Sequence, residues 1–563
     1  MARLIVIVLT GVLFQTAIFV RLQENPSTAS SYSCSPSKFQ QANSEVVETI
    51  ERIKKEADAH SQVENTLSYL TEVIGPRLTA GEGLKKANEW TRDKLKEWGL
   101  ENARLEPWGP FGRTWSLSHF QAALVEPQTI PLIAYPKAWS PGTPGTLVAP
   151  VVYIDAQDTS ELQKYRGRLK DTIVLMTPAR AIKLGFQATA RRQSDSQLLA
   201  LENAPRPAGT PRFQASPEQR QSGQLAAEKY QFFSAEGVAL VIEPTRSGVD
   251  GLGETGTIFI QSATVPQPYY EYPFDSRRIW PWQQQTPRVP PQVIISAEQY
   301  NRLVRMAQSG LKLRMRVELE VQFPGEELMS YNTLAEIPGE DLKDEIVMIG
   351  AHLDSWHSGT GATDNACSVA AIMEAVRILN ALKVRPRRTI RIALWSGEEQ
   401  GLRGSRSYVA RHFAKVGDGS IQAIMDAIRE ARLPSNLRVT ANHQKFSVYF
   451  NLDTGAGKIR GLYLQGNERA RPLIRDWLGP LKEMGVSTVS LANSDGSDNL
   501  PFDIVGLPSF QFLQDPLEYW TVTHHSNQDL YDRVPMEDLR HNVIVVAALL
   551  YRAAMAERKV PRK

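Results

Sequence analysis

Apolar residues form short continuous runs in the second half of the chain, and several of these runs end in acidic residues or histidine. The runs 346–349, 390–395, 446–450 and 507–513 are typical of buried strands. Between the first two runs, apolar residues recur every three or four positions from Val369 to Leu382, which predicts a helix with one buried face. This alternation indicates an α/β fold with a mixed, mostly parallel sheet flanked by helices.

The pattern changes character in the middle of the chain. Pro and Gly become dense after Pro127, and short β runs follow at 147–154, 172–176 and 237–242. The first pattern resumes near Met329. We therefore expect a domain whose two parts, 45–126 and 326–563, are separated by an inserted β-rich domain at 127–325.

Two segments stand out from this organisation. The tract 191–222 is polar and rich in Gln, Arg and Pro, which predicts a long excursion or a mobile loop. The segment 412–443 reads as a charged helical insertion without obvious chemistry.

Composition and charge narrow the class of protein. The chain has 563 residues, of which 42% are hydrophobic and 22% are charged, as in ordinary globular proteins. The 64 basic and 61 acidic residues nearly balance, so nothing predicts a nucleic-acid partner. Only Cys34 and Cys367 are present, which excludes a disulfide framework and a CxxC metal or redox site.

The first 30 residues resemble a targeting segment. Arg3 precedes an apolar run at 4–20, and a segment rich in Ser and Thr follows, as in a secretory signal peptide. An uncleaved N-terminal anchor is the alternative, because the apolar run is near the shortest length that spans a bilayer. We expect an exported protein (periplasmic, secreted or extracytoplasmic) with no membrane contact other than this segment.

Metal-capable side chains follow the apolar runs. They are His352, Asp364, Glu398, Glu399, Asp453 and His525. Imidazoles and carboxylates suit zinc, and a bridging carboxylate would hold two ions about 3.5–4 Å apart. Each residue alone has an ordinary interpretation, such as a structural histidine, a solvated acid pair or a turn aspartate. Their joint occurrence at strand ends favours a metal centre, because carboxylates crowded together without a cation repel each other.

The ordered motifs HxD, GATDN, GEE, NLD and HHS resemble those of peptidase family M28, the co-catalytic zinc exopeptidases. The resemblance covers most of 45–125 and 326–563, and it is strongest to the carboxypeptidase Q-like branch. The insert, with its runs at 167–176 and 226–242, is similar to the protease-associated (PA) domain that many of these enzymes carry.

The resemblance implies two zinc ions per chain. His352 and Asp453 would bind one ion, Glu399 and His525 the other, and Asp364 would bridge both. It also implies a cis peptide bond after Asp364.

The resemblance further implies catalytic roles. Glu398 would be the general base that passes a proton from the attacking water to the leaving amine. Asp354 would hold the outer nitrogen of His352, although it could be a solvated loop acid. His524 stands where many aminopeptidases of the family have a tyrosine, so we expect it to stabilise the oxyanion; a packing role is the alternative.

These features predict an exported zinc exopeptidase that hydrolyses short peptides, of aminopeptidase or dipeptidase type. A carboxypeptidase specificity and a homodimer stay open. The alternatives are a non-catalytic binding relative of the same fold and a glutaminyl-cyclase-like acyltransferase with one zinc. The filled ligand positions argue against the first alternative, and His352 and the insert argue against the second.

Overall fold

The computed structural model describes residues 36–207, 215–253, 255–325, 328–494 and 496–563. The predicted signal peptide or anchor, 1–30, lies outside these residues. The described part of the chain begins with helix α1 (Pro36–His60) and contains no helix that is both long and apolar enough to cross a bilayer.

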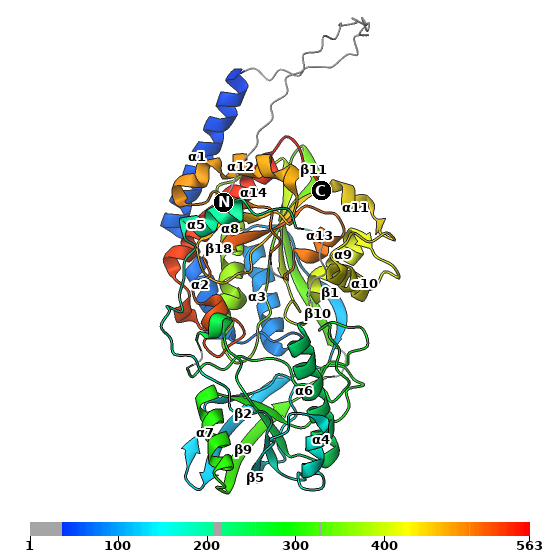
Figure 1. Cartoon of the computed structure of the whole chain (residues 1–563). Coiled ribbons are helices and arrows are strands. Elements are labelled where there is room, and N and C mark those ends of the chain that lie inside the picture. The colour runs from blue at the N-terminus through cyan, green and yellow to red at the C-terminus, as the bar shows by residue number, and fades with distance from the viewer. Residues whose placement is uncertain (1–35, 208–214, 254, 326–327, 495) are drawn as a thin grey trace, which may run out of the picture. The chain divides into compact units, whose positions relative to one another are not determined.

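The first sheet has eight strands, and its centre is parallel (Figure 1). In spatial order the strands are β1 (Glu101–Gly112), β10 (Leu328–Ile337), β12 (Arg388–Trp395), β11 (Leu342–His352), β15 (Phe446–Asn451), β18 (Ser509–Gln514), β16 (Ile459–Tyr463) and β17 (Thr488–Ser490). Strands β12, β11, β15 and β18 run parallel to one another. The predicted mixed, mostly parallel sheet is confirmed, because antiparallel strands are added only outside this centre.

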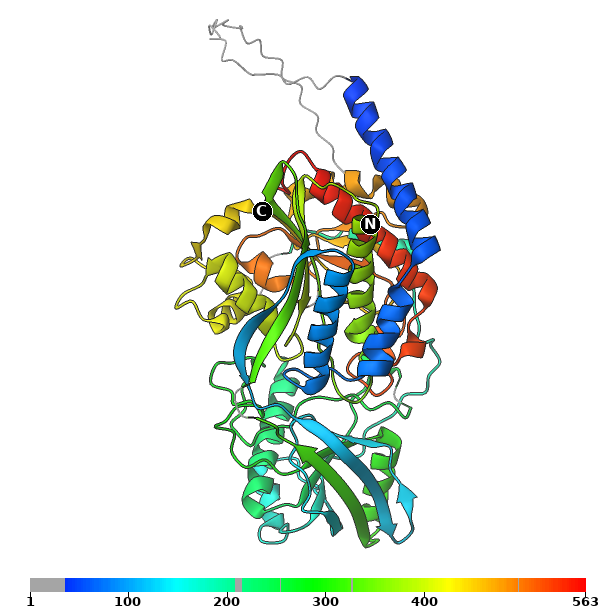
Figure 2. The same ribbon diagram turned by 180° about the vertical axis from the view of Figure 1, so that it is seen from behind.

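Helices cover both faces of the first sheet (Figures 1 and 2). One face packs against α3 (Glu82–Glu97), α8 (Cys367–Ala381) and α14 (Met536–Met555). The opposite face packs against α9 (Arg403–His412), α10 (Ile421–Glu430) and α13 (Leu500–Ile504). Other helices around this sheet include α2 (Val63–Ser68), α5 (Asp195–Glu202), α11 (Ala441–Lys445) and α12 (Arg471–Leu478). Burial on both faces explains why the central strands read as continuous apolar runs rather than alternating ones.

A second sheet of eight strands is built from the middle of the chain. In spatial order its strands are β3 (Ile130–Pro131), β2 (Ser116–Glu126), β9 (Leu313–Gln322), β5 (Thr146–Tyr153), β6 (Ile173–Leu175), β7 (Leu240–Pro244), β8 (Gln292–Ile295) and β4 (Ala134–Pro136). Its helices are α4 (Thr159–Leu162), α6 (Pro217–Glu236) and α7 (Ala297–Gln308). Strand β2 pairs with β9, so this sheet begins before residue 127. The division at 127 and 325 stays a prediction.

The tract 191–222 is not wholly a loop, and the segment 412–443 is partly helical, as expected. The tract 191–222 contains the short helix α5 (Asp195–Glu202) and the first turns of α6, and each of these helices begins with a capping box, at Ser194 and Ser216. The segment 412–443 contains α10 and the small hairpin of β13 (Ala414–Lys415) and β14 (Arg438–Val439). Both segments contribute to the cavity described below.

Candidate active site

The parallel strands bring the candidate residues to one edge of the first sheet. Strand β11 ends at His352, β12 is followed by Glu398 and Glu399, and β15 is followed by Asp453. The carboxyl ends of neighbouring parallel strands share one edge, which is where ligands bind in open α/β sheets.

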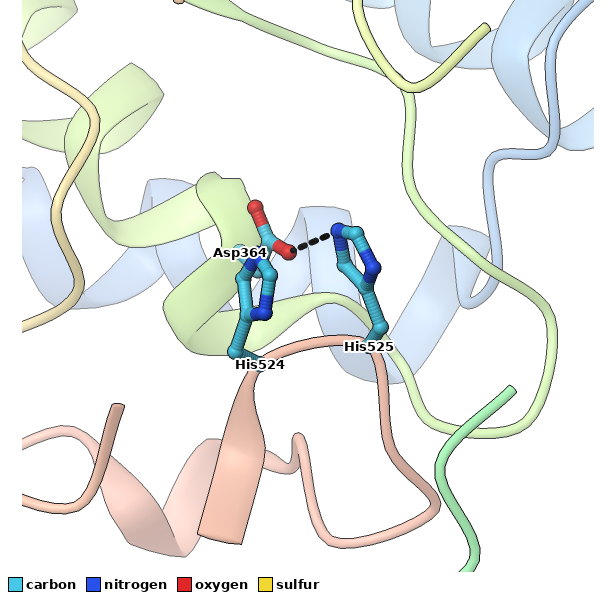
Figure 3. A group of neighbouring side chains, drawn as sticks. All are labelled: Asp364, His524 and His525. Atoms are coloured by element: carbon cyan, nitrogen blue, oxygen red, sulfur yellow. Dashed lines mark ion pairs between the residues drawn. The ribbon is translucent and has the colours of Figure 1, made fainter. Parts of the chain in front are cut away.

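Asp364 lies at the centre of these side chains. His352 Nε2 is 3.2 Å from Asp364 Oδ1 and 3.3 Å from Asp453 Oδ1. His525 Nε2 is 3.4 Å from Asp364 Oδ2 and 2.9 Å from Glu399 Oε2. The Asp364 carboxylate therefore contacts both histidines through different oxygens, and Figure 3 shows it facing His525.

The donor atoms fit a bound cation. Glu399 Oε1 is buried and has no hydrogen-bond partner among the described residues. Asp364 Oδ2 and Asp453 Oδ1 are also buried without a hydrogen bond there, each with only an imidazole nitrogen at ion-pair distance. Buried carboxylate oxygens without donors are costly unless a cation satisfies them. Two nitrogens and several carboxylate oxygens form the donor set that zinc prefers.

The pKa shifts of these side chains also indicate that the site requires a cation. Burial raises the pKa of Glu399 well above its usual value, and the neighbouring Asp364 carboxylate raises it further. Burial lowers the pKa of His352, but Asp453 and Asp364 outweigh that effect and raise it well above the ordinary value. Without a cation, these clustered side chains must take up protons. A bound divalent ion would instead favour the ionised form of the acids.

The first turns after the strands are fixed by close packing. Gly361 adopts a φ of 64°, and a Cβ there would lie 2.3 Å from the Ser355 Cβ. Gly397 adopts a φ of 72°, and its Cβ would lie 2.7 Å from the Trp108 ring. Glycine is therefore required three residues before Asp364 and immediately before Glu398. The predicted cis peptide bond between Asp364 and Asn365 is present.

Asp354 binds the turn that carries the two glutamates. Its buried carboxylate accepts hydrogen bonds from the backbone N–H groups of Glu398 and Glu399, both at 3.3 Å, and from Thr79 Oγ1 at 3.0 Å. His352 Nδ1 lies 3.0 Å from the Asp354 backbone carbonyl oxygen but 3.7 Å from Oδ1 of its carboxylate. The backbone of Asp354 thus orients the imidazole, and its side chain orients the glutamates.

His524 stacks on His525, with ring centroids 3.7 Å apart and an interplanar angle of 25°. Burial lowers the pKa of His524 well below its usual value and lowers the pKa of His525 to about 4. Both imidazoles are therefore neutral near pH 7. One ring nitrogen of each lies within 4.8 Å of an Asp364 carboxylate oxygen, so His524 belongs to the same cluster as the predicted ligands (Figure 3).

Three residues in contact with the site were not singled out from the sequence. Trp356 Nε1 donates a hydrogen bond of 2.6 Å to Glu399 Oε2. Asp529 accepts hydrogen bonds from the Thr363 hydroxyl at 2.8 Å and from the Asp364 N–H at 3.2 Å. Trp356 follows His352 closely in sequence, and Asp529 follows His525. This nearness was the feature of the sequence from which their role at the site could have been predicted.

The third is Arg77, which is fully buried. Its guanidinium donates to the backbone carbonyls of Leu353, Thr360 and Gly361, each at 2.8 Å. Burial lowers its pKa to about 10, so it stays charged at neutral pH. Arg77 thereby ties together both ends of the loop between His352 and Asp364.

Residues from the middle of the chain also hold the loop that carries His525. The Ile260 N–H donates to the His525 carbonyl at 2.7 Å, and the Asn527 N–H donates to the Ile258 carbonyl at 3.1 Å. Arg246 Nη2 donates to the His524 carbonyl at 3.5 Å. The strand-like segment 258–260 therefore pairs with the histidine loop through its backbone.

A cavity of about 890 Å³ opens over the cluster. All of the predicted site residues except Asp354 line it: His352, Asp364, Glu398, Glu399, Asp453, His524 and His525. Apolar parts of its wall come from Phe274 and, in α10, from Met425 and Ile428. A cavity of this size, with an apolar wall and a few polar groups, is typical of a small-ligand or short-peptide site.

Residues 332–550, which contain this entire cluster, match the family model described as peptidase family M28. This part of the chain is similar to peptidase family M28. Carboxypeptidase Q of Mus musculus is 25% identical over 499 residues, which cover 88% of this chain and 86% of that protein.

Two solved structures have the same fold. A peptidase M28 precursor from Shewanella amazonensis SB2B aligns with a TM-score of 0.62 at 23% identity and covers 92% of this chain and 99% of its own. A zinc aminopeptidase from Bacillus subtilis aligns with a TM-score of 0.52 at 19% identity and covers 88% of this chain and 95% of its own. The predicted resemblance to family M28 and the predicted fold are supported by these matches, whereas the individual residue roles stay predictions.

Proposed function

We propose that the chain is an exported di-zinc exopeptidase that hydrolyses short peptides. The observation that carries this proposal is the convergence of His352 and His525 on the two oxygens of Asp364, with buried carboxylate oxygens left for cations. The match to family M28 and the similarity to carboxypeptidase Q support a peptidase that acts at peptide ends. The zinc aminopeptidase of the same fold supports zinc as the metal.

The side chains divide into two sets around the bridging Asp364. His352 and Asp453 would hold one ion, and Glu399 and His525 the other. When bound, such ions lower the pKa of water and polarise a substrate carbonyl.

We assign the proton transfer to Glu398. It lines the cavity, its backbone is held by Asp354, and burial raises its pKa well above the usual value. Its carboxylate takes a proton from the attacking water as the carbon–oxygen bond forms. It then gives that proton to the amine nitrogen as the carbon–nitrogen bond breaks.

We assign stabilisation of the carbonyl oxygen to His524. A neutral imidazole can donate an N–H to that oxygen as negative charge develops on it. We expect His524→Phe, which keeps an aromatic ring and removes the donor, to lower kcat with little change in KM. An unchanged kcat would assign His524 to packing instead.

The proposal is tested with zinc-loaded protein and a panel of di- and tripeptides whose amino and carboxyl ends are free or blocked. We expect mass spectrometry to detect release of single residues only when one particular end is free. Binding without cleavage would support a non-catalytic relative, and cyclisation of an N-terminal glutamine would support an acyltransferase. N-terminal sequencing of the exported protein would test the signal peptide, and retention of residues 1–30 would favour an anchor.

A further inference from the structure

Residues 189–202, which we call the strap, run from the region of the second sheet along the edge of the active-site cavity. The backbones of Arg191 and Leu517 exchange two hydrogen bonds of 3.1 and 2.8 Å. The Thr189 hydroxyl donates to Glu518 Oε1 at 2.8 Å, and the Thr521 hydroxyl donates to the Thr189 carbonyl at 2.9 Å. The first residues of the strap are therefore bound to the segment that leads into the histidine loop.

Arg192 anchors the strap by ion pairs. Its guanidinium lies 3.0 Å from Asp515 Oδ2 and 2.7 Å from Asp538 Oδ2, and both carboxylates are almost completely buried. The pKa of Arg192 is raised because it donates to these two acids. The next residue, Gln193, donates its backbone N–H to Asp515 Oδ1 at 2.9 Å. Asp515 also pairs with Arg460 at 3.3 Å, and Asp538 lies 3.9 Å from Lys458 Nζ. Releasing the strap would still break the ion pairs of Arg192 with both buried acids, which is unfavourable.

The far end of the strap is held as well. Helix α5 begins with the capping box at Ser194. At its end, the Glu202 carbonyl accepts a hydrogen bond of 2.8 Å from Arg471, and the Glu202 carboxylate accepts one of 3.0 Å from Arg475. Figure 1 shows α5 in teal beside elements of the first sheet and its helices.

Two strap residues, Gln193 and Leu201, line the cavity together with His352 and Glu398. Leu199 lies on the same helix, but its side chain is 62% exposed. The strap therefore presents one apolar side chain to the cavity and another to solvent, and both of its ends are fixed.

We infer that the strap is a fixed wall that limits the length of peptide accepted, with Leu201 as a specificity-determining residue. This inference rests on the proposed function. A cavity below about 1,000 Å³ encloses only a small ligand, and a wall tied at both ends cannot move aside without breaking the ion pairs of Arg192.

The test measures kcat/KM for an unblocked dipeptide and for a hexapeptide that shares its terminal residues. Leu201→Ala shortens the wall, and we expect it to raise the hexapeptide-to-dipeptide ratio about 10-fold. Leu199→Ala is the matched control and leaves the ratio unchanged. Arg192→Lys keeps a charge but loses the forked contact, so we expect it to raise the ratio and to increase proteolytic cleavage within 189–202.

The outcomes separate the two proposals. If the parent protein cleaves the dipeptide but Leu201→Ala and Arg192→Lys leave the ratio at the parent value, the inference about the strap is overturned and the proposed function stands. If the zinc-loaded parent protein cleaves neither peptide, both are overturned.

Discussion

Each of the two sheets has a buried group of charged side chains nearby, and the two groups are built differently. Near the second sheet, the fully buried Lys137 lies 2.5 Å from Glu243 Oε1 and 3.3 Å from the Tyr230 hydroxyl, which itself donates to Glu243. That group contains its own cation and its own donors.

At the edge of the first sheet, the buried acids outnumber the histidines that pair with them. In the described part of the chain, Asp364, Glu399 and Asp453 form ion pairs with His352 and His525 alone. Buried carboxylate oxygens there have no hydrogen bond to any described residue. The comparison teaches that a partly buried acid paired with a buried lysine can be purely structural, whereas an excess of buried acids over histidines requires a cation from outside.

The largest expected effect is on catalysis at the first group. Glu398→Gln keeps the shape of the side chain and removes the proton acceptor, so we expect kcat to fall about 100- to 10,000-fold. The zinc content should not change, because Glu398 is not one of the proposed ligands. Steady-state kinetics with elemental analysis checks both points.

The matched control for this change is Glu430→Gln, which alters a solvent-exposed carboxylate at the end of α10 and leaves kcat unchanged. A fall in kcat of less than about 10-fold in Glu398→Gln would remove the residue from general-base catalysis.

A substitution in the charged group near the second sheet should lower stability rather than catalysis. Glu243→Gln leaves the Lys137 ammonium buried without its carboxylate, and we expect the free energy of unfolding to fall by about 3 kcal/mol. Urea unfolding of the parent and variant measures this difference. Turnover by the folded variant should stay unchanged. A loss of turnover without a loss of stability would contradict a purely structural role for this group.

A smaller effect is expected where a donor supports a proposed ligand. Trp356→Phe removes the N–H that donates to Glu399 Oε2, and we expect zinc affinity to fall about 10-fold. Competition with a chelator measures the affinity. Trp90→Phe is the control, because the Trp90 ring stacks on Tyr69 instead. Equal affinities in the two variants would show that the Trp356 hydrogen bond does not matter for metal binding.

The sequence predicts the central strands well because burial on both faces leaves a simple apolar run. The same runs place His352, Glu398, Glu399 and Asp453 at strand ends, and the order of motifs identifies the family. Asp364 and His525 lie on loops, and their approach to those strand ends was an expectation from the family resemblance rather than from periodicity.

Other contacts depend on tertiary structure that leaves no local pattern. Trp356 donates a hydrogen bond to Glu399, and the backbone of Ile260 pairs with that of His525, although the members of each pair are far apart in sequence. Helix α5 was hidden by the polar composition of its tract, although its capping residues, Ser194 and Gln197, were visible in the sequence. The carboxylate of Asp354 faces backbone N–H groups that no side-chain pattern predicts.

The central claim is that Asp364 bridges two cations. Its most direct test is the zinc content per chain, by elemental analysis, of the parent protein and of Asp364→Ala, with circular dichroism to confirm that the variant is folded. The account predicts two zinc ions per chain in the parent and none in the variant. Two zinc ions retained by folded Asp364→Ala would contradict it.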